Sequence, residues 1–368
     1  MFSVTVLLEN LKTSLTLAQH GVSSRTQLPV LLNFLLESKK EGLFVSSTDL
    51  ELGISIKIPA KIEEEGEITV SAKTFLDFLS NIKSEKVTLT QKDNTLELKA
   101  ERVHSRFPTI PATEFPKLYS NKGKLTAEFK KEDFDKEISR VVFSASYDSG
   151  RPALCGLLIK PEEKGLTLVA TDGYRLSLEL GFSETSNKGV GQLLLPARVL
   201  KELVGIKEQG TIKLYTSEEN NQVVFEVGDV SLVGRLIEAE YPEYQKIIPQ
   251  DFGTKAVFGR EEAASAVKAC SVIAREAANI VKMSIGKDKI VFSSSASSVG
   301  ENEIEVEAKV EGEENEIAFN ARYLLDFFGS VEDEEVSFEM SGPLSPGVFR
   351  LGKGNDYLHL IMPIRIQG

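Results

Sequence analysis

One eight-residue pattern occurs three times in this chain, and its spacing limits what the chain can fold into. Each copy starts with alanine and a basic residue, continues with a large apolar residue, and closes with an acidic residue and two apolar residues. The copies begin at Ala72, Ala197 and Ala321, spaced by 125 and 124 residues. Apolar positions three and four residues apart form one stripe of an amphipathic helix. Residues that cap or begin helices precede the copies: Ser71, Pro196 and Asn320. Three such helices at nearly equal spacing predict a threefold internal repeat.

The segments around these helices repeat as well. A Thr-Asp dipeptide at Thr48 returns 123 residues later at Thr171, although the third repeat has Ser295 and Ala296 in its place. A Glu-aromatic-Pro tripeptide occurs twice, 126 residues apart, starting at Glu114 and Glu240. A further amphipathic helix is predicted to open each repeat, starting at these residues: Leu8, Lys131 and Arg260. The repetition therefore covers whole domains and is not confined to one helix.

Whole-domain repetition predicts three domains of ordinary size, at residues 1–118, 123–248 and 254–368. Each contains two helices and short alternating strands, a pattern typical of helices packed on one face of a mostly antiparallel sheet. The predicted fold class is therefore α+β. In the first repeat we expect a strand over Leu28–Leu36. In the second we expect a helix from Lys131 to about Ala145 whose buried residues are Phe134, Ile138, Val141 and Val142.

The composition narrows the class of protein. The chain has 368 residues, 41% of them hydrophobic, and a net charge of −12, which argues against a surface covered by a nucleic-acid footprint but permits a local basic surface. Its longest apolar run, within 28–36, is too short to span a bilayer, and no signal peptide is evident. The two cysteines, Cys155 and Cys270, are far apart, which favours a reducing compartment. We therefore expect a cytoplasmic protein with no membrane partner.

No motif in the sequence indicates catalysis. Phosphate-binding loops, paired histidine motifs and metal-ligand cysteine spacings do not occur, so we expect no cofactor, no metal site and no enzymatic activity. The three histidines, His20, His104 and His359, are isolated in the sequence, which favours ordinary surface or core positions.

The segment from Asp172 to Arg175 is the one short stretch that invites a functional interpretation. Thr-Asp-Gly is typical of a tight turn between strands, since glycine adopts positive φ and aspartate bonds its own backbone. Tyr174 and Arg175 have no counterpart in the first repeat, and both residue types are enriched at binding hot spots. These residues alone leave a turn and a ligand anchor equally open.

At this point the chain resembles a known family. Arg151-Pro152-Ala153-Leu154, Ala170 to Leu176, Tyr241-Pro242-Glu243-Tyr244 and Met362 to Ile366 are similar, in order, to segments of the bacterial DNA sliding clamp, the beta subunit of DNA polymerase III. The resemblance extends over the full length. It implies a DNA polymerase processivity factor: a head-to-tail homodimeric ring, with helices lining the hole, that encircles duplex DNA without reading its sequence.

The resemblance also implies partners and a docking site. Short peptide motifs of the replicative polymerase subunit, the clamp loader, translesion polymerases and mismatch-repair proteins would bind in a pocket between the second and third domains. Apolar residues with a few polar anchors suit such a groove. The residues carried over to it are Leu154, Thr171, Gly173, Tyr174, Arg175, Leu176, Pro242, Lys246, Ile247, Leu344, Leu360, Ile361, Met362, Pro363, Ile364 and Arg365.

Two further sets of residues follow, the first from spacing and resemblance together and the second, at a dimer contact, from the resemblance alone. Basic residues that share helix faces or match family loops are expected to face DNA: Arg25, Lys136, Arg140, Arg151, Arg198, Lys201, Arg260, Lys268 and Arg275. From spacing alone, a solvated mixed-charge face explains them as well. The dimer contact is expected to join the first domain of one copy to the third of another through Lys73, Phe107, Val272, Ile273, Glu301 and Glu303.

Two other functions compete with this one. The first is a non-catalytic scaffold of three repeats that binds proteins without encircling DNA. The second is a hydrolase that uses Asp172 and Arg175, which is disfavoured because the sequence gives them no accompanying base, nucleophile or metal ligand.

Overall fold

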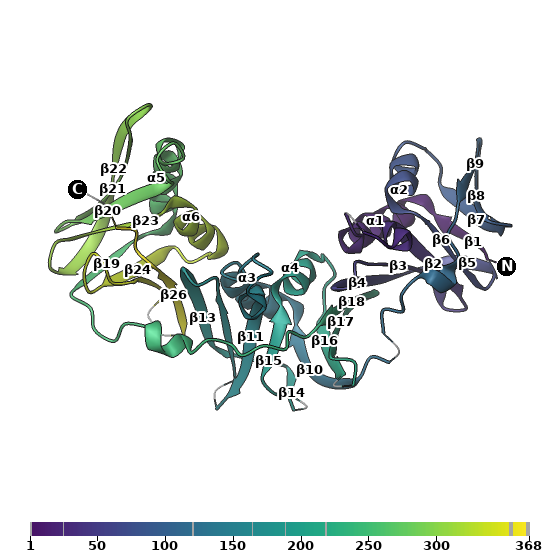
Figure 1. The fold of residues 1–368 in the computed structure, drawn as a ribbon, viewed down its shortest axis with the longest axis horizontal. Helices are drawn as coiled ribbons and strands as arrows, with labels where there is room; N and C mark the ends of the chain where they lie inside the picture. Colours follow the sequence, from purple (N-terminus) through teal and green to yellow (C-terminus); the bar gives the residue numbers. More distant parts are fainter. Residues whose placement is uncertain are drawn as a thin grey trace. The chain divides into compact units, whose positions relative to one another are not determined.

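The structure, a computed structural model, describes residues 2–24, 26–119, 121–163, 165–187, 189–217, 219–352 and 356–365. The chain forms two compact units, and the boundary between them passes through the second repeat. Unit 1 comprises Met1–Glu132, Thr185–Gly189 and Gly205–Leu236, and unit 2 comprises Asp133–Glu184, Val190–Val204 and Ile237–Gly368. Figure 1 shows the elements of both units coloured along the chain.

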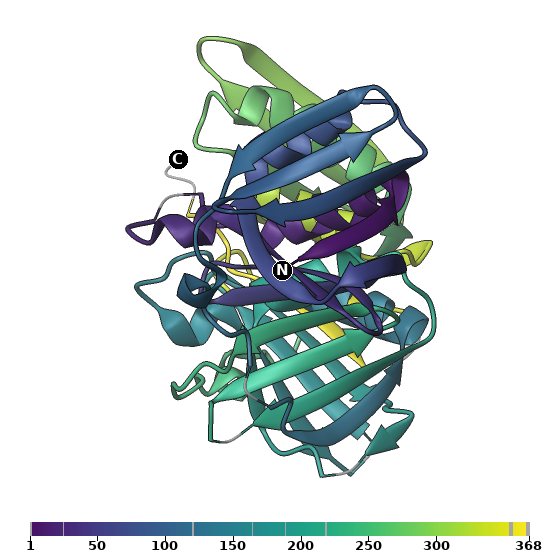
Figure 2. The same cartoon turned by 90° about the vertical axis from the view of Figure 1, so that its right-hand side faces the viewer.

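Unit 1 contains two antiparallel sheets, whose purple-to-blue strands face the viewer in Figure 2. The five-stranded sheet has the order β5-β1-β7-β8-β9, and the nine-stranded sheet has the order β14-β10-β16-β17-β18-β4-β3-β2-β6. The second sheet is continuous across two repeats because β18 pairs with β4. The strands are β1 Ser3–Leu7, β2 Asn33–Lys39, β3 Gly42–Thr48, β4 Leu52–Ile58, β5 Ala60–Glu64, β6 Gly66–Ser71, β7 Lys86–Lys92, β8 Thr95–Ala100, β9 Val103–Pro108, β10 Lys124–Lys130, β14 Ser186–Asn187, β16 Thr211–Ser217, β17 Gln222–Val227 and β18 Val230–Arg235.

Unit 2 contains one twelve-stranded antiparallel sheet with the order β15-β11-β12-β13-β26-β25-β24-β19-β22-β21-β20-β23. The second and third repeats meet within it where β13 pairs with β26. The strands are β11 Gly156–Glu162, β12 Gly165–Thr171, β13 Arg175–Phe182, β15 Leu193–Pro196, β19 Thr254–Gly259, β20 Ile280–Ile285, β21 Lys289–Ala296, β22 Gly300–Gly312, β23 Asn315–Asn320, β24 Glu335–Met340, β25 Gly347–Leu351 and β26 Tyr357–Ile361.

Two α-helices lie in each repeat, as the sequence predicts. They are α1 Leu8–Ala18, α2 Ala72–Ser80, α3 Lys131–Val142, α4 Ala197–Gly205, α5 Arg260–Ala274 and α6 Ala321–Ser330. The stripe expected on α3 is buried in full: Phe134, Ile138, Val141 and Val142. Asn320 caps α6, because its side chain accepts a hydrogen bond of 2.9 Å from the backbone NH of Arg322. These helices pack on antiparallel sheets, which confirms the predicted α+β class. No described helix combines the length and the hydropathy that crossing a membrane requires.

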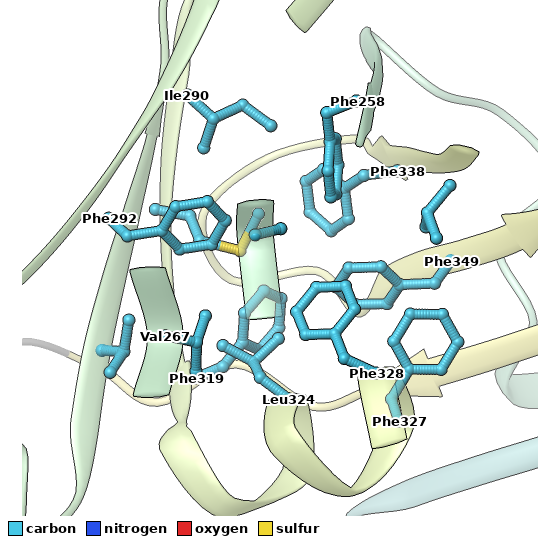
Figure 3. Close-up of a cluster of buried hydrophobic side chains, with 14 of the residues drawn as sticks. Phe258, Val267, Ile290, Phe292, Phe319, Leu324, Phe327, Phe328, Phe338 and Phe349 are labelled. Atoms are coloured by element: carbon cyan, nitrogen blue, oxygen red, sulfur yellow. The ribbon is translucent and has the colours of Figure 1, made fainter. Parts of the chain in front are cut away.

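Aromatic side chains fill the core of the third repeat. The ring of Phe327 lies 4.9 Å from that of Phe349 and stacks on His359 at 5.0 Å, and Phe319 meets Phe338 edge to face. Figure 3 shows the four phenylalanine rings converging from α6, β23, β24 and β25. Tight aromatic packing of this kind fixes α6 on the sheet, so the residues at its start are held in place.

The two Thr-Asp segments form the same turn, as the sequence predicts. In the first repeat the Thr48 hydroxyl donates to the carbonyl of Leu52 at 3.0 Å, and the Asp49 carboxylate accepts from the NH of Leu52 at 2.9 Å. In the second, the Thr171 hydroxyl donates to the carbonyl of Arg175 at 2.6 Å, and the Asp172 carboxylate accepts from the NH of Arg175 at 3.0 Å. The internal repeat thus extends to individual hydrogen bonds.

The strand expected over Leu28–Leu36 is wrong in its first half. A short 3₁₀ helix occupies Pro29–Leu32, and β2 begins only at Asn33. Proline lacks the NH that a strand ladder needs and its φ suits the first turn of a helix, so this start follows from the sequence.

Candidate functional site

The turn at Thr171 places Tyr174 and Arg175 at the start of β13, where the second repeat meets the third. Gly173 has a φ of 92°, which favours glycine, and its NH donates to the Thr171 hydroxyl. The carbonyl of Tyr174 accepts a hydrogen bond of 2.8 Å from the NH of Met362, just beyond β26. The turn is therefore tied to the end of the chain, and side chains of both repeats gather around it.

Arg175 is buried, and its guanidinium group makes three hydrogen bonds within the protein. It donates to Asp172 at 3.0 Å, to Asp326 of α6 at 2.6 Å and to the carbonyl of Phe143 at 3.1 Å. The ring of Tyr323 lies against it, 4.6 Å from the guanidinium carbon. Because successive strand residues point to opposite faces, this group lies on the other face of β13 from its neighbour Leu176. Arg175 thus joins the two repeats and holds the turn in place.

An apolar floor lies on the Leu176 face of the sheet. Leu176 pairs with Leu360 of β26, which pairs in turn with Val348 of β25, and all three are fully buried. Tyr241 covers this cluster and donates a hydrogen bond of 3.3 Å to the carbonyl of Val169, and burial raises the pKa of its hydroxyl. The floor is rigid because strands and an aromatic cover hold it.

Large apolar residues remain exposed around this floor. Tyr174 is 59% exposed and Leu344 is 62% exposed, and Ile247 and Met362 are also exposed. All four come from the expected peptide pocket, in which the structure also leaves Pro242, Lys246 and Arg365 exposed. Lys246 forms an ion pair with Glu243. Clusters of exposed apolar residues with polar neighbours are typical of protein-binding surfaces.

Tyr174 also lines a cavity of about 650 Å³, together with residues of the second and third repeats. Four arginines contribute cationic groups to its wall, and three tyrosines contribute aromatic rings: Arg151, Arg175, Arg275, Arg322, Tyr147, Tyr174 and Tyr323. The sequence analysis did not assign several of its residues: Tyr147, Asn279, Asn320, Arg322 and Tyr323. Three of these stand at the start of α6, in the third copy of the repeated pattern, which predicts a helix but does not indicate the cavity that its residues line.

The residues considered for catalysis have structural partners instead. His359 is fully buried, its Nδ1 lies 2.8 Å from the hydroxyl of Ser177, and burial together with the nearby charge of Arg175 lowers its pKa well below the usual value. Asp172 and Arg175 bond each other and the turn. Among the described residues, no cluster of three potential metal ligands occurs.

The basic residues expected to face DNA fall into two groups. Arg140 and Arg260 are largely buried: Arg140 pairs with Asp333 at 3.0 Å, and Arg260 donates to the carbonyl groups of Asp333 and Phe328. Exposed or half-buried side chains make up the second group: Lys136, Arg151, Arg198, Lys201, Lys268 and Arg275. Arg151 pairs with Asp148, and Lys201 donates to the hydroxyl of Tyr147. Arg25 lies outside the described residues.

The residues expected at the dimer contact lie on two strand edges and two helices. Phe107 of β9 is only 7% exposed because it packs between Phe75 and Phe78. Val272 of α5 is 63% exposed. Exposed charged side chains complete the set: Lys73 on α2, and Glu301 and Glu303 on β22. Ile273 is half-buried.

Comparison with known proteins finds one family whose domains match the three repeats in order. Three family models match in order: the N-terminal domain of the DNA polymerase III beta subunit at residues 2–119, its central domain at 128–243 and its C-terminal domain at 245–365. The chain belongs to the DNA polymerase III beta subunit family. It is therefore a sliding clamp subunit, a processivity factor of DNA replication.

Individual relatives agree along the whole length. The beta sliding clamp of Staphylococcus aureus is 28% identical over 380 residues, which cover 99% of this chain and 100% of the relative. The crystal structure of the DNA polymerase III beta subunit from Thermotoga maritima superposes with a TM-score of 0.89 at 28% identity, and that of the sliding clamp from Bacillus subtilis with 0.90 at 25%. In both comparisons the matched residues cover 100% of this chain and 100% of the solved structure.

Proposed function

We propose that two copies of this chain close head to tail into a ring around duplex DNA and tether other replication proteins to it. The observation that carries the proposal is the match of all three domain models, in order, along a chain whose first two repeats share the hydrogen bonds of the Thr-Asp turn. The repeats act as three domains, at 1–118, 123–248 and 254–368. The ring works in the cytoplasm as a non-catalytic subunit.

Client proteins dock at the junction of the second and third repeats. An extended peptide lays its apolar side chains against the exposed Tyr174, Ile247 and Met362, which the buried floor of Leu176 and Leu360 supports from below. The wall is made by the residues named for this pocket above except Arg175, whose guanidinium group donates to Asp326 of α6 on the opposite face of β13. The backbone and the turn at Arg175 are fixed by hydrogen bonds, so the peptide meets a preorganised groove. Clients are the replicative polymerase subunit, the clamp loader, translesion polymerases and mismatch-repair proteins.

The exposed cations on the helices and loops contact DNA phosphates. Phosphate contacts position a protein without reading bases, and each contact is weakened by salt. Lys136, Arg198, Lys268 and Arg275 serve this purpose, with Arg151 and Lys201. Arg140 and Arg260 instead hold α3 and α5 to the loop at Asp333.

Two open strand edges support the head-to-tail contact. In unit 1, β9 ends its sheet. In unit 2, residues 300–307 of β22 pair with β21 on one side, whereas β19 pairs with β22 only from Ala308 onward, so no strand of the described part of the chain pairs with the other side. Glu301, Glu303, Glu305 and Glu307 alternate along this edge, and β9 carries His104 and Arg106. An added strand satisfies backbone groups at both edges, and opposite charges fix its partner.

Sedimentation analysis and peptide titration test this proposal together. The protein is expected to sediment as a dimer at micromolar concentration. A fluorescent peptide from a client polymerase is expected to bind once per chain, and Met362→Asp, at a residue that is 39% exposed, is expected to abolish its binding while the dimer persists. A monomer, or peptide binding that survives Met362→Asp, would contradict the corresponding part of the proposal. Leu180→Asp, which alters an exposed residue of β13, serves as the matched control.

A further inference from the structure

Unit 1 contains a small cavity whose walls repeat the architecture of the client pocket. Its volume is about 160 Å³, and it lies beside the Thr48 turn at the junction of the first and second repeats. Pockets that enclose drug-sized ligands measure roughly 300 Å³ or more. The smaller space of about 160 Å³ suits one apolar side chain of an extended peptide.

The strand register around the cavity repeats as well. Gly53 of β4 pairs with Val233 of β18, as Leu176 of β13 pairs with Leu360 of β26. The preceding turns share their hydrogen bonds, as described above. The segment at Leu118 follows the repeated Glu-aromatic-Pro tripeptide, as Tyr244 does in the second repeat. The cavity is therefore the counterpart of the proposed client pocket, one repeat earlier in the chain.

Leu50 at the mouth of the cavity is an unusual residue. It occupies the position of Gly173, has a φ of 80° and leaves 57% of its surface exposed. A non-glycine residue at positive φ costs stability, and an exposed leucine gains nothing from burial in the free protein. Such an outlier is a reason to look for a partner that covers it.

The floor and the rim of the cavity define the partner. Leu118 lies directly on Gly53, since a Cβ at Gly53 would stand 2.8 Å from a methyl group of Leu118, and Val233 lies beside them. Lys117 and Arg235 are exposed on the rim, against the single acid Glu51. The wall also carries the polar side chains of Thr48, Asn220 and Gln222, which can bond the backbone of an extended peptide. Cations that outnumber acids on the rim, beside the apolar Leu50 and Leu118, favour a leucine-sized residue flanked by acidic residues.

We propose that this cavity is a second peptide-docking site, which takes one apolar side chain of an extended, acidic peptide between Leu50, Leu118 and Arg235. The inference rests on the proposed function, because it assigns to the first junction the kind of ligand proposed for the second. A client that carries two such segments would be held at two points of one chain, which raises its avidity without new contacts at the client pocket.

Photocrosslinking tests the proposal on the full-length protein. The probe is the acetylated peptide Gly-Asp-Leu-Asp-Gly with a diazirine in place of the leucine side chain, and adducts are mapped by mass spectrometry. We expect adducts within 48–53 or 116–118 in addition to adducts near Tyr174 or Met362. A peptide with lysines in place of the aspartates is expected to give fewer adducts at the cavity beside the Thr48 turn, called the first site because it lies at the first junction.

Two variants decide the outcome. Leu50→Asn keeps a residue type that tolerates positive φ but removes the apolar side chain, and is expected to lower the yield at the first site about tenfold. Arg235→Gln is expected to lower it severalfold, and neither variant should alter adducts near Tyr174. Absence of adducts at the first site, or yields unchanged in both variants, would overturn the inference. Absence of adducts near Tyr174 alone would instead count against the client pocket.

Discussion

Glu179 offers a sharp test of how the second and third repeats are joined. It lies on β13 and pairs in register with Tyr357 of β26, and it is only 7% exposed. Its Oε2 and the Oε2 of Glu137 on α3 are buried and have no hydrogen-bond partner among the described residues. Burial, reinforced by the negative charge of Glu137, raises the pKa of Glu179 to about 8. A protonated Glu179 can donate to Glu137, whereas two carboxylates repel each other.

The sign of the pH dependence follows from this pKa. Between about pH 4.5 and pH 8 the folded protein holds a proton on Glu179 that the unfolded chain releases, so the free energy of unfolding falls as pH rises through this window. At about 1.4 kcal/mol per pH unit, the raised pKa corresponds to roughly 5 kcal/mol. Relaxation around the buried charge reduces the observable effect, and we expect about 2–5 kcal/mol at pH 9.

The variant Glu179→Gln mimics the protonated carboxyl group and removes the titration. Urea unfolding from pH 5 to pH 9 should give equal stabilities for variant and parent at pH 5, and a variant that is more stable by about 2–5 kcal/mol at pH 9. Glu132→Gln, an exposed acid on the same helix as Glu137, is the control and should follow the parent at every pH. Arg140 and Asp356 also act on Glu179, and their charges are the same in all three proteins. A constant difference between Glu179→Gln and the parent across this range would refute the reasoning.

Four further predictions concern other parts of the molecule. Ile273→Arg places a charge at the proposed dimer contact, so sedimentation should show monomers at concentrations where the parent is a dimer. Asn320→Ala removes the cap of α6 and should lower the free energy of unfolding by about 1 kcal/mol in chemical denaturation. Arg175→Met removes the cation that the half-buried Asp172 and Asp326 share and should lower that free energy by about 3 kcal/mol. Lys268→Gln should weaken DNA binding at low salt and reduce the slope of log affinity against log salt by about 1, whereas Arg260→Gln should affect stability more than this slope.

Much of the fold could be predicted because the chain repeats itself. A stripe such as Phe134 and Ile138 is weak evidence alone, but three stripes at equal spacing strengthen each other. The turn at Asp172 was predictable because aspartate and glycine form it through local hydrogen bonds. Strand β9 was missed, since its sequence, with His104 and Pro108, lacks apolar alternation and its place depends on pairing with β8.

The site was harder to predict because its residues are brought together by long-range contacts. Arg140 appears on a helix face as one of several cations, and only the fold reveals Asp333, 193 residues away, as its partner. Arg175 was named as a pocket residue, and the alternation of β13 turns its guanidinium group toward α6 instead. Tyr323 was missed, although it stands in the repeated helix, because a helix pattern does not indicate which cavity its residues line.

Retention on DNA as a function of topology tests the central claim most directly. The protein is loaded by a clamp loader onto nicked circular DNA, washed in high salt, and the circle is then linearised. Electrostatic binding falls steeply with salt on any DNA, whereas a closed ring is held by topology. We predict that the protein survives the wash on the circle and is lost on linearisation. Loss from both forms in high salt, with a known clamp retained in parallel, would contradict encirclement and favour the scaffold of three repeats.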